Sequence, residues 1–360
     1  MSNDTVTRVS LSPIPRHSGP SGTGIQTSLA VGYLHDLDGN SADPVALALE
    51  LGRTLGVTAT TLTDRWETLA TLAAVDLALA RAIEPHLDAR GILDEARAAG
   101  EPIPDAAASS EATWGVFAAE GPVVPLVATF TDGSWSLTGV KPWCSLAGVL
   151  DRALITARTS DGQRLLFAVD LHHPGVTVPD GAWHARGLTE IPSGPVDLDA
   201  VPAETVGSPG WYLERPGFAT GGIGVAACWF GGAVGLARTL FAAASANPTP
   251  SPFTLMHLGA VDEALADARR ALAEAVAVIQ SGDTNLDRAI LAKQIRGTVA
   301  RACETVMERV GHALGPAPLA LDESHAKRVA DLQLYIRQHH AERDDAGLGQ
   351  ALVEQGATPW

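Results

Sequence analysis

The first third of the chain has apolar positions spaced as in amphipathic helices. Between residues 43 and 99, Leu and Ala recur at intervals of three and four residues, which places them along one face of a helix. Residues 100–110 contain two prolines and interrupt this pattern. The pattern predicts an N-terminal helical domain over residues 29–110. A flexible, polar N-terminal tail is expected before it, over residues 1–28.

Between residues 111 and 212 the apolar period shortens to that of β-strands. Short runs rich in Val, Leu and aromatic residues alternate with turn signals such as Asp132-Gly133 and Pro174-Gly175. Successive runs begin roughly every ten residues, a spacing typical of antiparallel barrels and sandwiches. The sequence therefore predicts a middle antiparallel β-barrel domain over residues 111–212.

Helical spacing returns after residue 212 and predicts a C-terminal four-helix bundle over residues 213–346, followed by a C-terminal tail over residues 347–360. Residues 216–237 contain seven glycines and no charged side chain. This segment is only weakly apolar, so it is expected to form a buried helix rather than a membrane span. The last helix is expected to begin near Asp322 or Ser324 and to run to His339 and His340. The predicted fold class is α+β.

Composition excludes several classes of protein. Hydrophobic residues make up 46% of the 360 residues, enough for a large core. The 25 basic and 41 acidic residues leave a net charge of −16, which argues against nucleic-acid and anionic-membrane partners. The N-terminus lacks the apolar core of a secretion signal, so we expect a cytoplasmic protein. The three cysteines are far apart and no HExxH string occurs, so neither a disulfide framework nor a metal site is expected.

Two neighbouring strings carry a specific resemblance. The strings GVKPWCS at residues 139–145 and DRALITAR at residues 151–158 resemble the middle domain of the acyl-CoA dehydrogenase family. The similarity continues in residues 166–176, 196–202 and 221–235. Recognisable motifs cover residues 135–238, and the likeness in architecture begins near residue 44.

The resemblance implies an FAD cofactor and assigns residues to it. By position in the motif, Trp143 would pack on the flavin ring and Ser145, two residues further along a strand, would hydrogen-bond to flavin N5. Phe117 is a further candidate for packing on the ring, and Cys144 lies between the two motif residues. The alternative is that Trp143 is a core aromatic residue and Ser145 the end of a strand.

The sequence departs from the family in two places. The family's T-E-P-x-A-G-S-D segment is replaced by WGVFAAEGP at residues 114–122, and its R-x-x-F-G motif by a proline-rich stretch at residues 246–252. Any FAD would therefore bind more weakly than is usual in the family or be held through other contacts. A cofactor-free scaffold or interaction protein of the same fold stays open as an alternative.

The resemblance also places the catalytic base. One family position for a glutamate falls at Val225, and the other falls at His339, with His340 beside it. Histidine can transfer protons at neutral pH. The first hypothesis is therefore FAD-dependent α,β-dehydrogenation of an acyl thioester, with His339 as base. The second is a flavin-dependent monooxygenase of the same fold that oxygenates a small aromatic or amine substrate, in which His339 would work beside Ser145. Both histidines could instead form a solvated helix end.

The expected partners follow from these hypotheses. They are an acyl thioester or another small-molecule substrate, and an electron-transfer partner or oxygen that reoxidises the flavin. The resemblance implies a homodimer or homotetramer.

Overall fold

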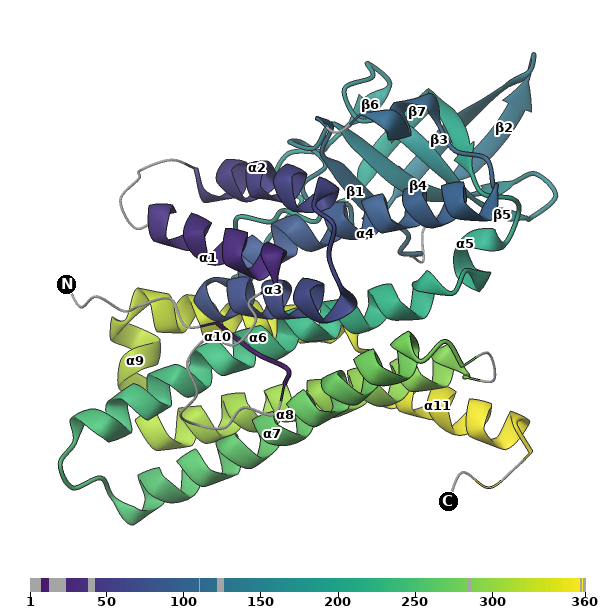
Figure 1. Ribbon diagram of the computed structural model, residues 1–360. Helices are drawn as coiled ribbons and strands as arrows, with labels where there is room; N and C mark the ends of the chain where they lie inside the picture. The colour runs from purple at the N-terminus through teal and green to yellow at the C-terminus, as the bar shows by residue number, and fades with distance from the viewer. Residues whose placement is uncertain are drawn as a thin grey trace.

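The computed structural model describes residues 8–12, 24–37, 43–109, 111–121, 126–283, 286–356 and 358. The β-sheet lies at one end of the molecule with helix 77–99 along it, and the helices from the C-terminal part of the chain pack against the N-terminal helices (Figure 1). The predicted α+β class, with a sheet between two helical parts, is confirmed.

Four helices form the N-terminal part, and polar side chains begin three of them. Asp43, Thr61 and Asp76 accept hydrogen bonds from backbone N–H groups in the first turn of the helix that follows each. The last helix ends at Gly100, whose φ of 72° suits glycine. The helices are α1 (Ile25–Leu37), α2 (Pro44–Val57), α3 (Leu62–Val75) and α4 (Leu77–Ala99).

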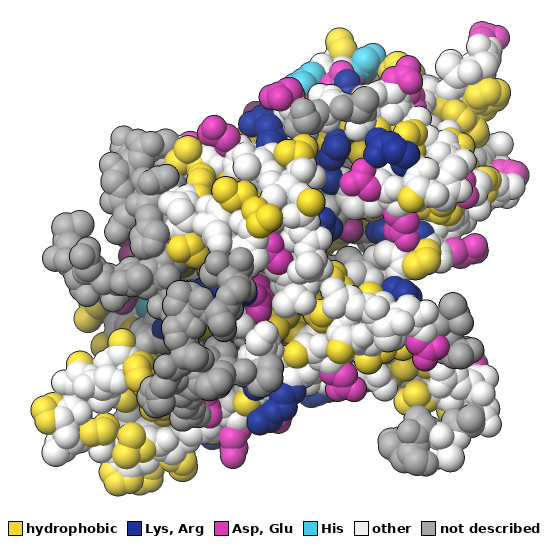
Figure 2. Space-filling view, viewed as in Figure 1, with side chains coloured by type: hydrophobic (Ala, Val, Ile, Leu, Met, Phe, Trp, Pro, Cys, Tyr) yellow, Lys and Arg dark blue, Asp and Glu magenta, His cyan; other side chains and the backbone are white. Residues whose placement is uncertain are grey.

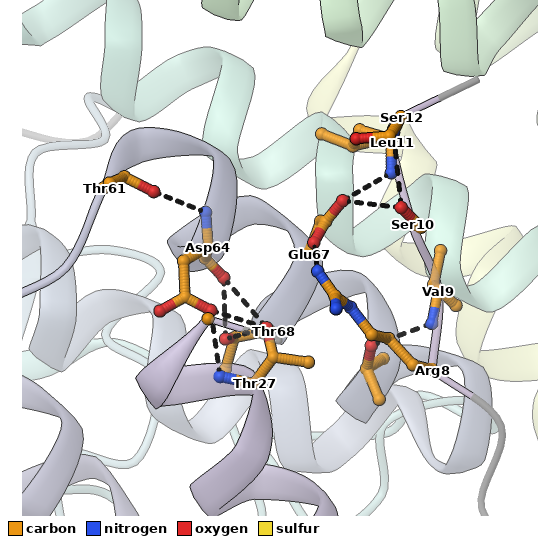
Figure 3. A network of polar contacts seen from close by, with 12 residues as sticks. Arg8, Val9, Ser10, Leu11, Ser12, Thr27, Thr61, Asp64, Glu67 and Thr68 are labelled. Atoms are coloured by element: carbon orange, nitrogen blue, oxygen red, sulfur yellow. Dashed lines mark hydrogen bonds and ion pairs between the residues drawn. The ribbon is translucent and has the colours of Figure 1, made fainter. Parts of the chain in front are cut away.

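Part of the expected N-terminal tail is fastened to α3 (Figure 3). The buried Glu67 carboxylate accepts hydrogen bonds from the Leu11 N–H and the Ser10 hydroxyl, both at 2.8 Å, and pairs with Arg8. Val9 and Leu11 are 5% and 1% exposed. Residues 8–12 therefore differ from a free tail, because two apolar side chains and one carboxylate hold them on the helix.

A seven-stranded sheet occupies the middle of the chain. The strands are β1 (Trp114–Phe117), β2 (Val127–Thr131), β3 (Ser134–Lys141), β4 (Arg152–Thr159), β5 (Arg164–Asp170), β6 (Val176–Thr177) and β7 (Val196–Val206), preceded by a 3-10 turn, η1 (Asp105–Ala108). The pairings β4–β2–β3–β7–β5 return to β4, because β5 also pairs with β4. β1 and β6 attach to β4 and β7.

The prediction of a purely antiparallel sheet is wrong. β4 pairs in parallel with both β1 and β2. The turn at Asp132-Gly133 reverses the chain between β2 and β3, and residues 142–151 then carry it across so that β4 runs in the direction of β2. Alternation of apolar residues gives the same pattern for either direction, so it could not distinguish them.

The C-terminal part is built on three long helices, of which α6 packs against α3, α7, α8 and α10. The elements are α5 (Trp211–Glu214), α6 (Gly217–Ala246), α7 (Pro252–Gln280), α8 (Arg288–Leu314), α9 (Pro316–Leu321), α10 (Glu323–Tyr335), η2 (Ile336–Gln338) and α11 (Glu342–Glu354). α6 is long and apolar enough to cross a membrane by length and composition, but 67% of its most apolar window is buried within the protein.

The end of the chain differs from the expected pattern. Asp322 caps α10 as predicted, accepting a hydrogen bond from the His325 N–H. The helix, however, ends at Tyr335, and a 3-10 turn precedes His339. α11 then occupies residues expected to begin a tail. Leu348 and Leu352, four residues apart, give it one apolar side, and acidic residues in its first turn favour its N-terminus.

α4 connects the helical part to the sheet. One of its sides contributes Ile92, Leu93 and Ala96 to a core with Trp114 on β1 and Leu154 on β4. Its other side packs against α2, α3 and α6. Side chains on α4 therefore reach both the sheet and the bundle.

Figure 2 shows hydrophobic side chains gathered at the end of the molecule where α6 leads into α7. This end carries four exposed apolar side chains, which are Phe241, Phe253, Leu255 and Met256.

Candidate active site

The loop after β3 has an unusual backbone. Trp143 and Leu146 adopt φ values of 62° and 60°, in the left-handed region that non-glycine residues rarely occupy. The Cys144 N–H donates to the Gly194 carbonyl at 2.9 Å, and the Leu146 N–H to the Pro192 carbonyl at 2.8 Å. These hydrogen bonds hold the loop in a backbone conformation that is unfavourable for residues other than glycine.

The loop separates the two motif residues into different environments. β3 ends at Lys141, so Trp143 and Ser145 do not share the face of a strand as predicted. Trp143 is 58% exposed, whereas Ser145 is 5% exposed. The left-handed turn at Trp143 thus presents the indole to solvent beside a buried hydroxyl.

Ser145 has two close hydrogen-bonding partners. Its Oγ accepts a hydrogen bond from Arg81 Nη2 at 2.7 Å and lies 2.7 Å from Ser193 Oγ, a contact in which either hydroxyl can donate. Ser193 Oγ also lies 3.0 Å from the Ile191 carbonyl oxygen, which can accept its hydrogen. Because a serine carries one hydrogen, the arrangement that satisfies both contacts has Ser193 donating to Ile191 and Ser145 donating to Ser193. In that arrangement one lone pair of Ser145 Oγ remains for a further donor.

Arg81, on α4, connects this loop to the bundle. Its Nη1 lies 3.4 Å from Glu84 Oε2, and its guanidinium lies over the Tyr335 ring at 5.4 Å. Tyr335 meets the edge of Trp229, and Arg296 lies 4.7 Å from the centre of the Trp229 ring. Residues from α4, α6, α8 and α10 therefore converge behind Ser145.

A cavity of about 210 Å³ lies between α3, α4 and α6. The wall of the cavity formed by α6 has few side chains, because glycines face α4 there. A Cβ on Gly221 would lie 2.8 Å from Asp88 Oδ1, and one on Gly224 would lie 3.4 Å from Trp66 Nε1. The glycine-rich start of α6 therefore allows the charged side of α4 to approach and leaves space between the helices.

Five charged side chains line the cavity: Arg65, Glu84, Asp88, Glu95 and Arg215. Arg215 Nη1 lies 2.7 Å from Glu95, and its Nη2 lies 3.7 Å from Asp88. Burial raises the pKa of Asp88 and lowers the pKa of Arg65. Burial also raises the pKa of Glu84 to about 7, against the opposing effect of Arg81. The cavity therefore has a charged side, and Leu62, Trp66, Leu69 and Leu87 form its apolar lining.

Two of the residues assigned to the cofactor lie in the core. Phe117 and Cys144 are each 2% exposed. The Cys144 thiol donates to the Lys141 carbonyl at 3.2 Å, and burial raises the pKa of this thiol. Both side chains are packed within the protein, so neither is part of the candidate flavin site.

The two histidines assigned to catalysis differ in environment. His339 is 7% exposed, and burial lowers its pKa. Its neighbour Gln338 is held by Arg296, whose Nη2 donates to the Gln338 carbonyl at 2.9 Å. His340 is exposed and faces Asp344, with 3.5 Å between Nδ1 and Oδ1. Ser145 is bonded to Arg81 and Ser193 rather than to His339.

Arg81 and Glu84 were missed by the sequence analysis. The available signal was the spacing of acidic residues on α4, where Glu84, Asp88 and Glu95 are four and seven residues apart and fall on one side of the helix. Pro85 lies within the same helix and has no N–H to donate to the Arg81 carbonyl. Within the described ranges, no group of three or more His, Cys, Asp or Glu residues is placed to hold a metal ion.

Comparison with known proteins gives structural neighbours only. No family model and no curated protein matches the sequence. TdsC from Paenibacillus sp. A11-2, a dibenzothiophene monooxygenase solved with FMN and indole, superposes with a TM-score of 0.75 at 17% identity, over 93% of this chain and 97% of TdsC. The nitrososynthase from Micromonospora carbonacea var. africana gives 0.76 at 18% identity, over 92% and 96%. The chain has the acyl-CoA dehydrogenase-like fold.

A third neighbour was solved with a flavin and a sugar nucleotide. KijD3, in complex with FMN and dTDP-3-amino-2,3,6-trideoxy-4-keto-3-methyl-D-glucose, has a TM-score of 0.71 at 19% identity, over 92% of this chain and 86% of KijD3. At these identities the likeness shows the shared fold, and the chemistry of this chain has to be argued from its own residues.

Proposed function

We propose that the protein is a flavin-dependent oxygenase that binds the flavin in its reduced form and acts on a small polar molecule. The loop at Trp143 and Ser145 fits a flavin. The exposed indole offers a flat apolar surface to an isoalloxazine ring, and burial of such area dominates the binding of aromatic ligands. The neighbouring hydroxyl offers one hydrogen-bonding position.

The hydrogen bonding of the Ser145 hydroxyl is the reason for proposing that the flavin binds in its reduced form. When Ser193 donates to the Ile191 carbonyl, the Ser145 hydrogen goes to Ser193, so towards a ligand Ser145 accepts a hydrogen bond. N5 of an oxidised flavin is an acceptor, whereas N5 of a dihydroflavin bears a hydrogen. Ser145 therefore favours the dihydroflavin, the form that reacts with oxygen.

The charged side of the cavity favours a substrate with polar groups over a fatty acyl chain. An acyl chain placed among Glu84, Asp88 and Arg215 would bury these groups against methylene groups that offer no hydrogen bonds. A cavity of about 210 Å³ also suits a small molecule. Arg81 joins it to the flavin loop, because one end of its guanidinium contacts Glu84 and the other Ser145.

The chain's own residues would orient and protect the reactants. When bound, the dihydroflavin would supply two electrons, so that one atom of O₂ is transferred to the substrate and the other leaves as water. Trp143 would cover the ring, and Ser145 would fix its position. Arg81 would hold Ser145 and Glu84 in place, and Glu84 would exchange a proton with the substrate.

Flavin binding by Trp143 variants tests this proposal. Trp143→Ala should weaken binding of dihydro-FMN by about 2–4 kcal/mol, the usual cost of removing a packed aromatic ring. Phe130→Ala is the matched control, because Phe130 is equally exposed at 57% but lies on the β2–β3 hairpin. Anaerobic equilibrium dialysis gives both constants, and circular dichroism checks the fold. Unchanged affinity in Trp143→Ala, or no flavin binding by the unaltered protein, would refute the proposal.

The candidates for the flavin are FMN and FAD. FMN is present in the TdsC and KijD3 structures, and FAD is implied by the family resemblance. Competition between dihydro-FMN and dihydro-FAD in the same dialysis distinguishes them. A separate reductase would supply the reduced flavin, and a homodimer in the cytoplasm stays the prediction from sequence.

The second candidate is the dehydrogenation of an acyl thioester with His339 as base. One observation favours it: burial lowers the pKa of His339, so its ring is neutral and able to accept a proton at pH 7. Bleaching of bound oxidised flavin by an acyl-CoA under anaerobic conditions would support this candidate, and no bleaching with short-chain or long-chain thioesters would eliminate it.

A further inference from the structure

The segment of residues 187–194 supports the loop that follows β3. It consists of bends and a turn before β7, and it lies against the loop of residues 142–146. Two of its carbonyl groups accept hydrogen bonds from backbone N–H groups of that loop, at 2.9 and 2.8 Å, and its Ser193 Oγ lies 2.7 Å from Ser145 Oγ. The position of the segment therefore determines both the backbone of the loop and the surroundings of the Ser145 hydroxyl.

One buried carboxylate fastens the segment to α10. Asp331 is 1% exposed, and its Oδ1 accepts a hydrogen bond from the Leu188 N–H at 2.5 Å. Leu188 is itself buried and has a φ of 50°, a left-handed conformation that a leucine keeps only where its surroundings hold it. A buried N–H group without an acceptor is costly, so the carboxylate stabilises this turn of the backbone.

An ammonium group connects the same carboxylate to its surroundings. Lys327 Nζ lies 2.7 Å from Asp331 Oδ2 and 3.1 Å from Glu190 Oε1, within the segment. It also lies 2.8 Å from Oδ1 of Asp76, the residue that caps α4. The charge of the buried Asp331 is therefore compensated, and α4, α10 and the segment meet at one side chain.

The segment and α10 also meet through their backbones. Gly187 and Ala330 immediately precede the two hydrogen-bonded residues, and a Cβ on Gly187 would overlap the Ala330 carbonyl oxygen. The neighbouring atom belongs to the backbone of a helix and cannot rotate away. A side chain at position 187 would therefore push the segment away from α10.

We propose that Asp331 is a positioning residue for the flavin site. By holding the 187–194 segment on α10, it keeps Ser193 beside Ser145 and keeps the loop at Trp143 in its left-handed conformation. The inference rests on the proposed function, because it concerns the same site. Asp331 acts through Leu188 and the segment and takes no part in the chemistry.

The contact between Ser193 and Ser145 connects this position to the choice between the two forms of flavin. Hydrogen bonds between hydroxyl groups form at about 2.5–3.0 Å, so a displacement of about 1 Å separates the two side chains. The hydrogen of Ser145 can then point at a ligand, and the hydroxyl serves oxidised N5 as a donor as well as reduced N5–H as an acceptor. Release of the segment should therefore remove the preference for dihydroflavin, whereas a loss of global stability alone should not.

Hydrogen exchange in the flavin-free chain tests the inference without relying on flavin binding. Asp331→Leu removes the acceptor, whereas Asp331→Asn keeps an oxygen for the Leu188 N–H. Peptides that contain Cys144 and Leu146 should exchange about ten-fold faster or more in Asp331→Leu, and within about three-fold of the unaltered rate in Asp331→Asn. Val310→Ala, at a buried position on α8, is the control for general destabilisation and should leave these peptides unchanged.

Flavin binding provides a readout that a purely structural role would not change. The ratio of the dissociation constants of oxidised FMN and dihydro-FMN should fall to about one in Asp331→Leu and keep its unaltered value in Asp331→Asn and Val310→Ala. Unchanged exchange in Asp331→Leu, equal acceleration in Val310→Ala, or no rescue by asparagine would overturn the inference. If the unaltered protein shows no preference for dihydro-FMN, the oxygenase proposal fails, and the exchange rates alone decide the role of Asp331.

Gly187→Ala perturbs the same contact and decides the question if Asp331→Leu does not fold. The new Cβ displaces the segment and leaves Asp331 and Ser193 in the chain, so the same peptides should exchange about ten-fold faster. Gly259→Ala, whose Cβ meets nothing within 4 Å, is the matched control and should leave their exchange unchanged. Exchange at the unaltered rate in Gly187→Ala would overturn the inference.

Discussion

Arg81 Nη2 donates to Ser145 Oγ at 2.7 Å, although 64 positions separate the two residues in the sequence. This bond joins helix α4 to the loop that follows β3. The same guanidinium contacts Glu84 and lies over Tyr335, so one side chain connects the expected flavin loop, the cavity and the bundle.

Arg81→Ala should destabilise the fold. The substitution removes the bond to Ser145 and leaves Glu84 without its cation in a buried position, a change that typically costs about 3–5 kcal/mol. Urea unfolding measures it. Arg97→Ala is the control, because the Arg97–Asp94 pair is 47% and 61% exposed and should contribute less than about 1 kcal/mol. Equal effects of the two substitutions would contradict the role given to Arg81.

Gly231→Ala should destabilise the protein. Its Cβ would meet the backbone of Ala70 on α3, which cannot move aside as a side chain can, and overpacking of this kind costs about 1–3 kcal/mol. Gly259→Ala, on α7, meets nothing within 4 Å and should stabilise its helix by up to about 1 kcal/mol. Thermal unfolding of the pair should therefore give shifts of opposite sign, and shifts of the same sign would count against the close approach of α3 and α6.

The stability difference between the unaltered protein and Glu84→Gln should depend on pH. The pKa of Glu84 is raised from 4.5 to about 7 in the folded state, so its protonated form stabilises the fold. This contribution is fully present below pH 4.5 and is lost as pH rises through 7. Glutamine does not titrate, so the variant should gain up to about 3 kcal/mol relative to the unaltered protein across this window. Urea unfolding at pH 4.5, 6 and 8 measures the difference, and a constant difference would exclude the raised pKa.

His339→Ala separates the two candidate functions. If the protein dehydrogenates acyl thioesters, the substitution should slow anaerobic flavin reduction roughly 100-fold, the typical cost of losing a general base. His340→Ala should have a smaller effect, because its side chain is exposed and faces Asp344. If the oxygenase proposal holds, neither substitution changes the binding of dihydro-FMN. Stopped-flow absorbance distinguishes these results.

The sequence predicts the order of the elements well, because helices and strands have different apolar periods and the segments are long. The period of apolar residues predicts α3 and α4, and turn signals separate the strands of the sheet. Strand direction was not predictable, since β4 is a short run of consecutive buried residues, which fits parallel and antiparallel partners alike.

The candidate site was predicted in part. The motif that contains Trp143 and Ser145 is continuous in sequence and could be recognised. The partners of Ser145 could not, because Arg81 and Ser193 lie 64 and 48 positions away and reach it only through the packing of α4 and the loop before β7. The left-handed backbone conformation at Trp143 could not be predicted either. Such positions are usually occupied by glycine or asparagine, and a tryptophan does not indicate one.

The dissociation constants of dihydro-FMN and oxidised FMN, measured anaerobically on the same protein, test the central claim most directly. With Ser193 donating to Ile191 and Ser145 donating to Ser193, Ser145 has a lone pair left for N5–H, so the reduced form should bind at least ten-fold more tightly. Ser145→Ala should reduce that preference, while Ser134→Ala, on the β2–β3 hairpin, should preserve it. Equal or tighter binding of oxidised FMN by the unaltered protein would contradict the account.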